Sequence, residues 1–130
     1  MRQENLKNNR DILLETRNLS VEFPLKKKSF IEKQKMLSAV SDVSIQIRKG
    51  ETFGLVGESG CGKSTFANAT LGFVKPRSGE IYFNGQPLYA EKKAVQEARL
   101  HMQKIFQDPA SSLNPRFTVR EAVCEPMRIR

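Results

Sequence analysis

A glycine-rich run near the middle of the chain restricts the folds open to it. The run fits the pattern G-x-x-x-x-G-K-[ST], whose four fixed positions match by chance at only about a few sites in 10⁵. Its members are Gly57, Glu58, Ser59, Gly60, Cys61, Gly62, Lys63, Ser64 and Thr65. Such a run works where a strand leads into it and a helix follows it. Thr52–Val56 and Lys63–Phe73 have those two patterns, so we predict an α/β fold around a phosphate-binding loop.

Each residue type in this loop has a chemical reason to be there. Glycines at 57, 60 and 62 allow positive φ and a close approach to an anion. The N–H groups of residues 60–65 would then point inward, and the helix start adds its positive dipole end, worth about 0.3–1 kcal/mol. Lys63 adds a full charge worth about 4 kcal/mol per charge pair at 4 Å and an effective dielectric near 20, so it should outweigh the dipole. Ser64 is placed to ligate Mg²⁺.

Cys61 lies inside the loop, two residues before Lys63. The simplest interpretation is a small side chain that the loop tolerates. The alternative hypothesis is that alkylation of the Cys61 thiol blocks nucleotide binding and that bound MgATP protects the thiol.

Periodicity predicts the remaining elements in outline. Strands are expected over Ile12–Phe23, Met36–Ile47 (as two pieces), Thr52–Val56, Glu80–Phe83 and Met102–Phe106. Helices are expected over Lys63–Phe73, with Phe66, Ala69 and Phe73 on one face, and over Glu91–Leu100. Asn84-Gly85 is a turn signal, and Thr118-Val119-Arg120-Glu121 is a capping box that opens a last helix, which Pro126 should interrupt.

The positive charge is concentrated in one segment. The chain has 22 Lys and Arg against 14 Asp and Glu, a net charge of +8, and Pro24–Lys35 holds five Lys and one Glu, half of that excess. A run of this kind is typical of a solvated loop, with contact to lipid headgroups or RNA as the alternatives. The two cysteines lack metal-ligand or disulfide-framework spacing, the apolar runs are too short to span a bilayer, and the polar N-terminus is not a signal peptide.

Longer stretches of the sequence resemble one family. Residues 50–65 closely resemble the ATP-binding subunits of ABC transporters. Ile105-Phe106-Gln107-Asp108-Pro109 and Ser112-Leu113-Asn114-Pro115-Arg116 look like the Q-loop region of the oligopeptide/dipeptide and nickel importer branch. The form GESGCGKST, with Cys before Gly62, looks most like the oligopeptide F-type subunit. The resemblance covers residues 12–130 and leaves residues 1–11 as a polar tail.

The resemblance implies ATP and Mg²⁺ as cofactors and assigns further residues. Gln107 matches the Q-loop glutamine, which contacts Mg²⁺ and the attacking water, so Lys63 and Gln107 are the catalytic candidates and Ser64 and Gln107 the Mg²⁺ ligands. Phe23 lies where the family places the aromatic ring that stacks on adenine, although a core phenylalanine at a strand end is the other interpretation. The implied fold is the N-terminal part of an ABC ATPase domain, with an antiparallel β subdomain and the start of the helical subdomain.

The same resemblance implies partners and a location. A subunit of this type works with a second ATPase subunit, with membrane-spanning permease subunits and, indirectly, with an external solute-binding protein. It sits on the cytoplasmic face of the cell membrane and is not expected to bind nucleic acid. The transported solute is not readable from these residues.

Several family elements are missing from these 130 residues. There is no LSGGQ-type signature, no apolar strand ending in Asp-Glu and no D-loop, and His101 precedes the Q-loop and cannot be the switch histidine. We therefore expect residues 12–130 to be an incomplete ABC ATP-binding domain that cannot hydrolyse ATP alone. A buried parallel sheet cut there would leave apolar edges open, so low solubility and weak ATP affinity are expected.

Other classes of protein remain possible from sequence alone. These are an ATPase for nickel or another solute, a different P-loop protein such as a small kinase or GTPase, and a basic nucleic-acid-binding ATPase. The position of Gln107, 44 residues after Lys63, argues against a kinase. Salt-dependent DNA affinity without nucleotide dependence would favour the nucleic-acid alternative.

Overall fold

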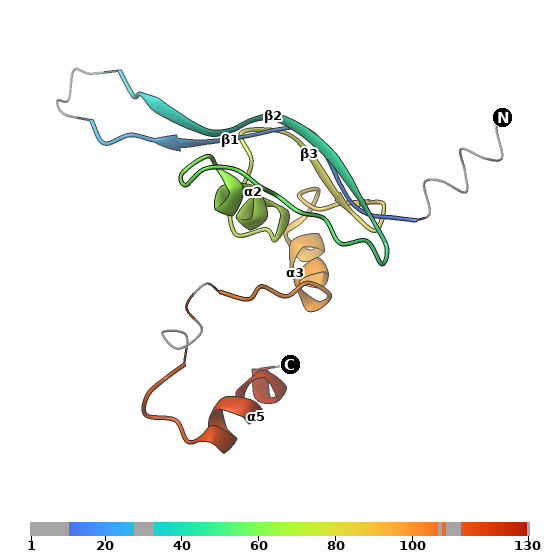
Figure 1. Cartoon of the computed structure of the whole chain (residues 1–130), viewed down its shortest axis with the longest axis vertical. Helices are drawn as coiled ribbons and strands as arrows, with labels where there is room; N and C mark the ends of the chain where they lie inside the picture. The colour runs from blue at the N-terminus through green and yellow to red at the C-terminus, as the bar shows by residue number, and fades with distance from the viewer. Residues whose placement is uncertain (1–10, 28–32, 107, 109–112, 130) are drawn as a thin grey trace.

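An antiparallel sheet forms the frame of the molecule. The computed structural model describes residues 11–27, 33–106, 108 and 113–129. Its strands are β1 (Ile12–Pro24), β2 (Met36–Arg48), β3 (Ser78–Phe83) and β4 (Gln86–Pro87), in the order β2-β1-β3-β4. The long strand β1 pairs with β2 on one side and with β3 on the other (Figure 1). Three predicted strands are thus confirmed, although β2 is one strand rather than two pieces.

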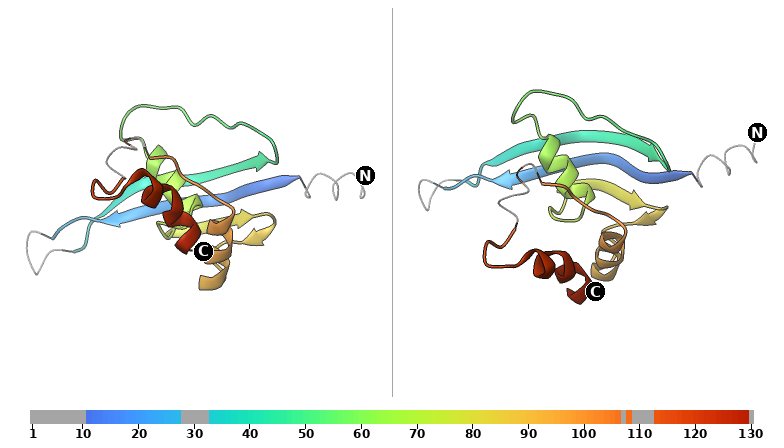
Figure 2. Two further views of the ribbon diagram at one scale, coloured as in Figure 1. Left: turned by 90° about the horizontal axis from the view of Figure 1, so that it is seen from below. Right: turned by 60° about the horizontal axis from the view of Figure 1, so that its bottom comes forward.

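The helices are α2 (Lys63–Thr70), α3 (Lys92–Leu100) and α5 (Val119–Ile129). Helix α2 lies against β1 and β2 on one face of the sheet, whereas α5 is drawn apart from the sheet (Figures 1 and 2). The buried apolar residues come from the sheet, α2, α3 and the loop after β4: Leu19, Val21, Val40, Phe66, Ala69, Ile81, Leu88 and Ala98. A sheet with α2 packed on one face confirms the predicted α/β class. Among the described residues, no helix combines the length and the apolar character needed to cross a bilayer.

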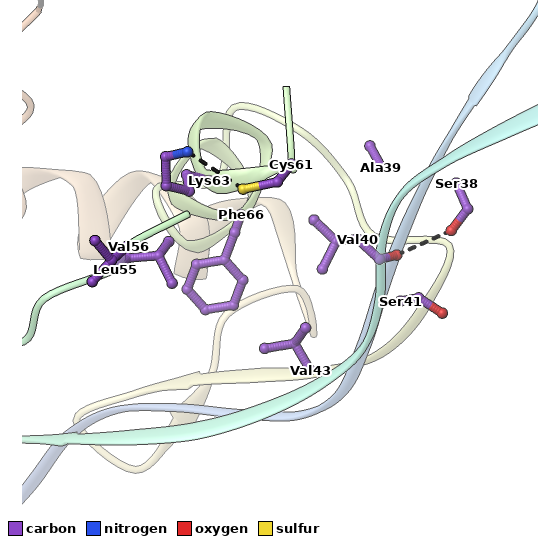
Figure 3. A pocket seen from close by; sticks show the side chains of 11 residues that line it. Ser38, Ala39, Val40, Ser41, Val43, Leu55, Val56, Cys61, Lys63 and Phe66 are labelled. Carbon is purple, nitrogen blue, oxygen red and sulfur yellow. Dashed lines mark hydrogen bonds between the residues drawn. The ribbon is translucent and has the colours of Figure 1, made fainter. Parts of the chain in front are cut away.

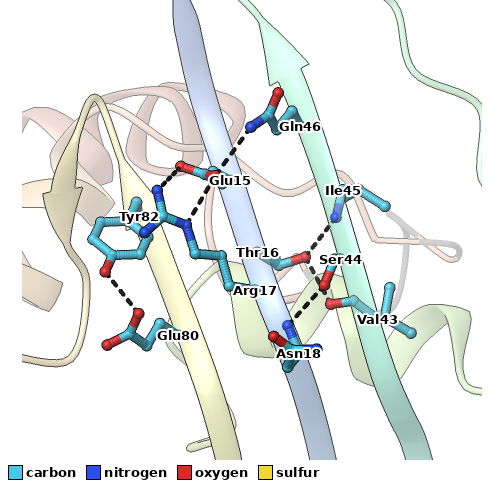
Figure 4. Close-up of polar contacts among 10 residues, drawn as sticks. All are labelled: Glu15, Thr16, Arg17, Asn18, Val43, Ser44, Ile45, Gln46, Glu80 and Tyr82. Carbon is cyan, nitrogen blue, oxygen red and sulfur yellow. Dashed lines mark hydrogen bonds and ion pairs between the residues drawn. The ribbon is translucent and has the colours of Figure 1, made fainter. Parts of the chain in front are cut away.

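A pair of bends sets the register between β1 and β2. Asn18 (φ 48°) and Asp42 (φ 52°) adopt left-handed backbone conformations, which Asn and Asp tolerate better than most residues. The Asn18 side-chain amide donates to the Asp42 carboxylate at 2.7 Å. The buried Thr16 hydroxyl donates to the Val43 carbonyl and accepts from the Ile45 N–H, both at 3.1 Å (Figure 4). These bonds satisfy backbone groups that the bends remove from the ladder.

A polar network joins β1, β2 and β3 on the face of the sheet that is exposed to solvent. Arg17 donates to both Glu15 carboxylate oxygens at 2.9 and 3.0 Å, and its guanidinium lies 4.6 Å from the centre of the Tyr82 ring (Figure 4). The Gln46 amide donates to Glu15 at 3.0 Å, and the Tyr82 hydroxyl donates to Glu80 at 2.7 Å. The hydrogen bonds from Arg17 hold the pKa of Glu15 below its ordinary value. Because Arg17 is exposed, the network helps to align β1, β2 and β3 more than it stabilises the fold.

Helix α2 ends earlier than predicted. Phe66 and Ala69 are buried as expected, but the helix stops at Thr70 and the Phe73 side chain is 56% exposed. The reason is Gly72, whose φ of 74° ends the helix about one turn before Pro76. The Arg99 guanidinium covers the Phe73 ring at 4.7 Å and donates to the Gly72 carbonyl at 2.6 Å. The Tyr89 hydroxyl lies 2.8 Å from the Ala69 carbonyl oxygen, so the carbonyls at this helix end have partners.

Two predicted strands are wrong. Thr52–Val56 and Met102–Phe106 have no regular secondary structure. The Val56 side chain is 92% exposed and that of Ile105 is 93% exposed. A strand is defined by hydrogen bonds to a neighbouring strand, and no described strand pairs with either segment. Their apolar sequences therefore indicate that these segments could pair with a strand, not that they do.

The signals at turns and helix starts are confirmed. Asn84 (φ 52°) and Gly85 (φ 78°) form the two-residue turn between β3 and β4. At α5, the Thr118 N–H donates to the Glu121 carboxylate at 2.8 Å, and the Thr118 hydroxyl accepts from the Glu121 N–H at 3.3 Å. The bond from the Thr118 backbone lowers the pKa of Glu121. The expectation that Pro126 interrupts this helix is wrong, because α5 continues through it to Ile129.

Hydrogen exchange should separate β1 from the unpaired segment 52–56. We expect the amides of Leu19 and Val21 to exchange at least about a hundredfold more slowly than those of residues 53–56, because only the former lie in a paired, buried strand. Amide exchange of the 130-residue chain, followed by NMR, makes the comparison. Equal protection in the two segments would show that residues 52–56 pair after all.

Candidate phosphate-binding site

The predicted loop runs over residues 57–62 and leads directly into α2. All three glycines have positive φ as expected: 158° at Gly57, 82° at Gly60 and 94° at Gly62. A Cβ added at Gly57 would lie 2.7 Å from the Cys61 sulfur, so the Cys61 side chain would have to move to make room for it. The sequence fixes this loop locally, because residues with side chains rarely adopt the conformations at Gly60 and Gly62.

The start of α2 offers unpaired donors. Gly62 is the N-cap residue, and no side chain caps the helix. The first bond back to the cap comes from the Phe66 N–H, which donates to the Gly62 carbonyl at 2.8 Å. The N–H groups at the first three positions of any α-helix have no partner within the helix, and no acidic residue lies in this first turn. An anion in front of Lys63 would satisfy these donors and the positive end of the helix dipole.

Lys63 closes the loop on itself. Its ammonium donates to the Gly57 carbonyl at 2.7 Å and the Glu58 carbonyl at 2.5 Å, and lies 3.3 Å from the Cys61 sulfur (Figure 3). The Cys61 N–H donates to the Glu58 carbonyl at 3.4 Å. The charge of Lys63 is thus held over the loop by neutral acceptors. A phosphate offers a stronger, charged acceptor, to which the ammonium can transfer.

The other residues predicted for the site differ in their exposure. Glu58, Ser59 and Cys61 are exposed, Ser64 is exposed on the first turn of α2, and Thr65 is half-buried. Gln107 falls outside the described residues, so its predicted contact with Mg²⁺ stays a prediction. In the described part of the chain, no group of three His, Cys, Asp or Glu side chains gathers as a metal site. A metal here would depend on Ser64 and on the nucleotide itself.

A backbone contact fixes the loop to the sheet. A Cβ added at Gly62 would lie 2.1 Å from the carbonyl oxygen of Ala39 in β2, so the two backbones are in direct contact. Sequence reasoning missed Ala39, because the contact is made by a carbonyl that every residue carries. The only signal was the glycine at 62.

The contact brings the end of the β1–β2 ribbon beside the loop. Phe23 pairs with Leu37 across the ribbon, two residues along β2 from Ala39. The Phe23 side chain is 38% exposed and is therefore not a core residue. That position is compatible with the predicted adenine contact, and the contact itself stays a prediction.

A cavity of about 400 Å³ lies beside the loop, between α2 and β2 (Figure 3). Its walls include the apolar side chains of Val40, Val43, Leu55, Val56 and Phe66, and they also include Cys61, Gly62 and Lys63 of the loop and the start of α2. The cavity is therefore apolar on the side of the sheet and polar where it meets the loop.

Known proteins share this arrangement. Residues 40–129 match the family model described as ABC transporter. The oligopeptide transport ATP-binding protein OppF of Haemophilus influenzae is 47% identical over 125 residues, which cover 94% of this chain and 38% of that protein. The oligopeptide transport ATP-binding protein AppF of Bacillus subtilis is 42% identical over 120 residues, covering 91% of this chain and 36% of that protein. The chain thus spans a little over a third of the length of these relatives.

Solved structures agree with the sequence comparisons. A dimeric bacterial ABC transporter cassette, MJ0796, superposes with a TM-score of 0.68 at 26% identity, covering 90% of this chain and 47% of that one. The structure of cbiO1 from Clostridium perfringens, part of the ABC transporter complex cbiONQ, gives a TM-score of 0.62 at 27% identity, covering 80% of this chain and 38% of that one. With the family model spanning the loop, α2 and most of β2, this chain belongs to the ABC transporter family of ATP-binding proteins.

Proposed function

We propose that this chain supplies the phosphate-binding part of an ATP site in an ABC-type importer. One observation carries the proposal: the Lys63 ammonium lies over a glycine loop directly in front of an uncapped helix start. The positive charge of Lys63 and the positive end of the α2 dipole therefore lie at the same end of the helix, and both favour an anion there. A nucleotide triphosphate matches that combination of charge and shape.

Each residue has a proposed role in this site. Lys63 binds the β- and γ-phosphates, and the backbone N–H groups of residues 60–65 surround them. Phe23, exposed at the end of β1, stacks on the adenine. Bound Mg²⁺ would neutralise phosphate charge, with the exposed hydroxyl of Ser64 as one ligand and Gln107 as another. Gln107 would also orient the attacking water.

The biological role follows from the relatives by proposal. Proteins named as oligopeptide transport ATP-binding proteins are 42–47% identical to this chain. We propose that the chain serves import of oligopeptides at the cytoplasmic face of the cell membrane, together with permease subunits, a second ATPase subunit and, indirectly, a solute-binding protein. The 130 residues contain the loop but no apolar strand that ends in Asp-Glu, which would supply the catalytic carboxylates. On their own they should bind MgATP without hydrolysing it.

Replacing Lys63 by alanine should weaken MgATP binding at least about tenfold, because it removes the full positive charge in the loop. The loss is smaller than the whole charge-pair energy, since Lys63 must first leave the Gly57 and Glu58 carbonyls. Titration with a fluorescent ATP analogue, with phosphate release followed in parallel, measures both properties. Lys75→Ala is the matched control, because Lys75 is exposed beyond the far end of α2. Equal affinity in Lys63→Ala and the unaltered chain, or no binding by the unaltered chain, would contradict the proposal.

Substitution of Gly60 and of Gly62 by alanine gives a matched pair of variants that tests the contact between the loop and β2. Both have positive φ, so alanine costs about 1–2 kcal/mol at either position. Only at Gly62 would the new Cβ meet the Ala39 carbonyl, whereas nothing lies within 4 Å of a Cβ at Gly60. Gly62→Ala should therefore lower the urea midpoint and the MgATP affinity more than Gly60→Ala does. The reverse order would mean that the loop is not held against β2 in this way.

Thiol labelling tests the position of Cys61. In a Cys124→Ser background, N-ethylmaleimide should label the exposed Cys61 and reduce nucleotide binding, because the adduct displaces the neighbouring Lys63 ammonium. MgATP should slow the labelling. Cys61→Ser is the control that keeps binding and loses sensitivity to the reagent. Complete labelling of Cys61 with unchanged ATP affinity would rule out the hypothesis.

A further inference from the structure

The arms of the hairpin between β1 and β2 carry a strong positive charge. Pro24–Lys35 contains five Lys and one Glu, a net charge of +4. The ladder continues past the paired residues Pro24 and Met36, because the Leu25 N–H donates to the Lys35 carbonyl at 2.9 Å. Lys26, Lys27 and Lys33 are exposed on the two arms. We call these three residues the hairpin lysines.

The hairpin begins beside the phosphate loop. Ala39, whose carbonyl touches Gly62, lies three residues along β2 from Met36, where the paired part of the ribbon ends. Figures 1 and 2 show the arms leaving the sheet at the end where the loop before α2 lies. At an extended rise of about 3.3 Å per residue, Lys33 is within about 20 Å of the Ala39 level, and Lys26 and Lys27 stand opposite that arm. This distance is within the reach of electrostatic forces at low salt.

We propose that the hairpin lysines steer the nucleotide to the phosphate loop, so that they raise its association rate without contacting it once bound. This inference rests on the proposed function. A positive field beside a site raises the local concentration of an anionic ligand. Two described carboxylates belong to this region: Glu22 lies 3.8 Å from Arg77, which offsets its charge, and the exposed Glu58 of the loop would repel a phosphate. The hairpin lysines offset that repulsion during approach.

The size of the effect follows from Coulomb's law. Three positive charges about 20 Å from MgATP, which carries two negative charges, should change the association rate about threefold at 10 mM salt. At 150 mM salt, with a Debye length of about 8 Å, the same charges should change it by less than about 1.5-fold. Steering therefore predicts that removal of the hairpin lysines lowers the association rate at low salt and leaves it almost unchanged at high salt.

The test compares two variants of equal net charge. The hairpin variant carries Lys26→Gln, Lys27→Gln and Lys33→Gln. The control variant carries Lys49→Gln, Lys75→Gln and Lys92→Gln, all exposed and outside the hairpin. Stopped-flow association of a fluorescent ATP analogue with Mg²⁺ is recorded at 10, 50 and 150 mM NaCl, together with dissociation by chase. An uncharged fluorescent adenosine serves as a second probe, and circular dichroism confirms that both variants fold like the unaltered chain.

The expected result is an association rate about threefold lower for the hairpin variant at 10 mM NaCl, convergence at 150 mM and unchanged dissociation. The control variant and the adenosine probe should show little change. Equal association rates for the two variants at 10 mM would overturn the inference and leave the proposed function intact. An anionic membrane or nucleic acid would then be the next partner to test for the hairpin lysines. A change confined to dissociation would overturn it by showing direct contact. No nucleotide binding by the unaltered chain would overturn both.

Discussion

The contact between Gly62 and the Ala39 carbonyl is the constraint on which the rest of the site depends. It allows no Cβ at residue 62, and it joins the first turn of α2 to an edge strand of the sheet. The paired part of β1 and β2 ends at Pro24 and Met36, three residues along β2 from Ala39. The same contact therefore sets the position of Phe23, Leu37 and the basic hairpin relative to the loop. A shift of one residue in β2 would turn a different set of side chains towards the loop. The bends at Asn18 and Asp42 oppose such a shift.

The two ends of α2 differ in a way that suits binding. The C-terminal end is closed, because Arg99 donates to the Gly72 carbonyl and the Tyr89 hydroxyl lies against the Ala69 carbonyl. Burial raises the pKa of the Tyr89 hydroxyl, which keeps its proton at neutral pH in any case. The N-terminal end has no side-chain cap, and Lys63 holds only neutral acceptors there. The helix is thus held by side-chain contacts at its C-terminal end, whereas the end that we propose to bind phosphate has partners that an anion can replace.

Local chemistry explains which features the sequence could predict. The loop, the Asn84-Gly85 turn and the Thr118 capping box each depend on a few neighbouring residues, so their patterns carry the full information. β1, β2 and β3 were predictable because their alternation and their pairing partners lie within the chain. Thr52–Val56 and Met102–Phe106 show the limit, since an apolar run cannot tell whether a partner strand is beside it. The contacts of Ala39 and Arg99 could not be predicted, because each involves a backbone carbonyl, which every residue carries, and the glycine at 62 alone does not say which carbonyl it meets.

The unpaired segment 52–56 has a consequence for affinity. The phosphate loop is fixed at its exit by Gly62, but its entrance follows Val56, which is 92% exposed. Ordering a backbone residue costs about 1–2 kcal/mol, so a nucleotide that must order even two residues at this entrance loses a few kcal/mol of binding energy. Pairing of 52–56 with another strand would remove that cost. Weak binding by these residues alone would therefore arise from an unanchored entrance rather than from defective phosphate chemistry, since Lys63 and the α2 start are already in place.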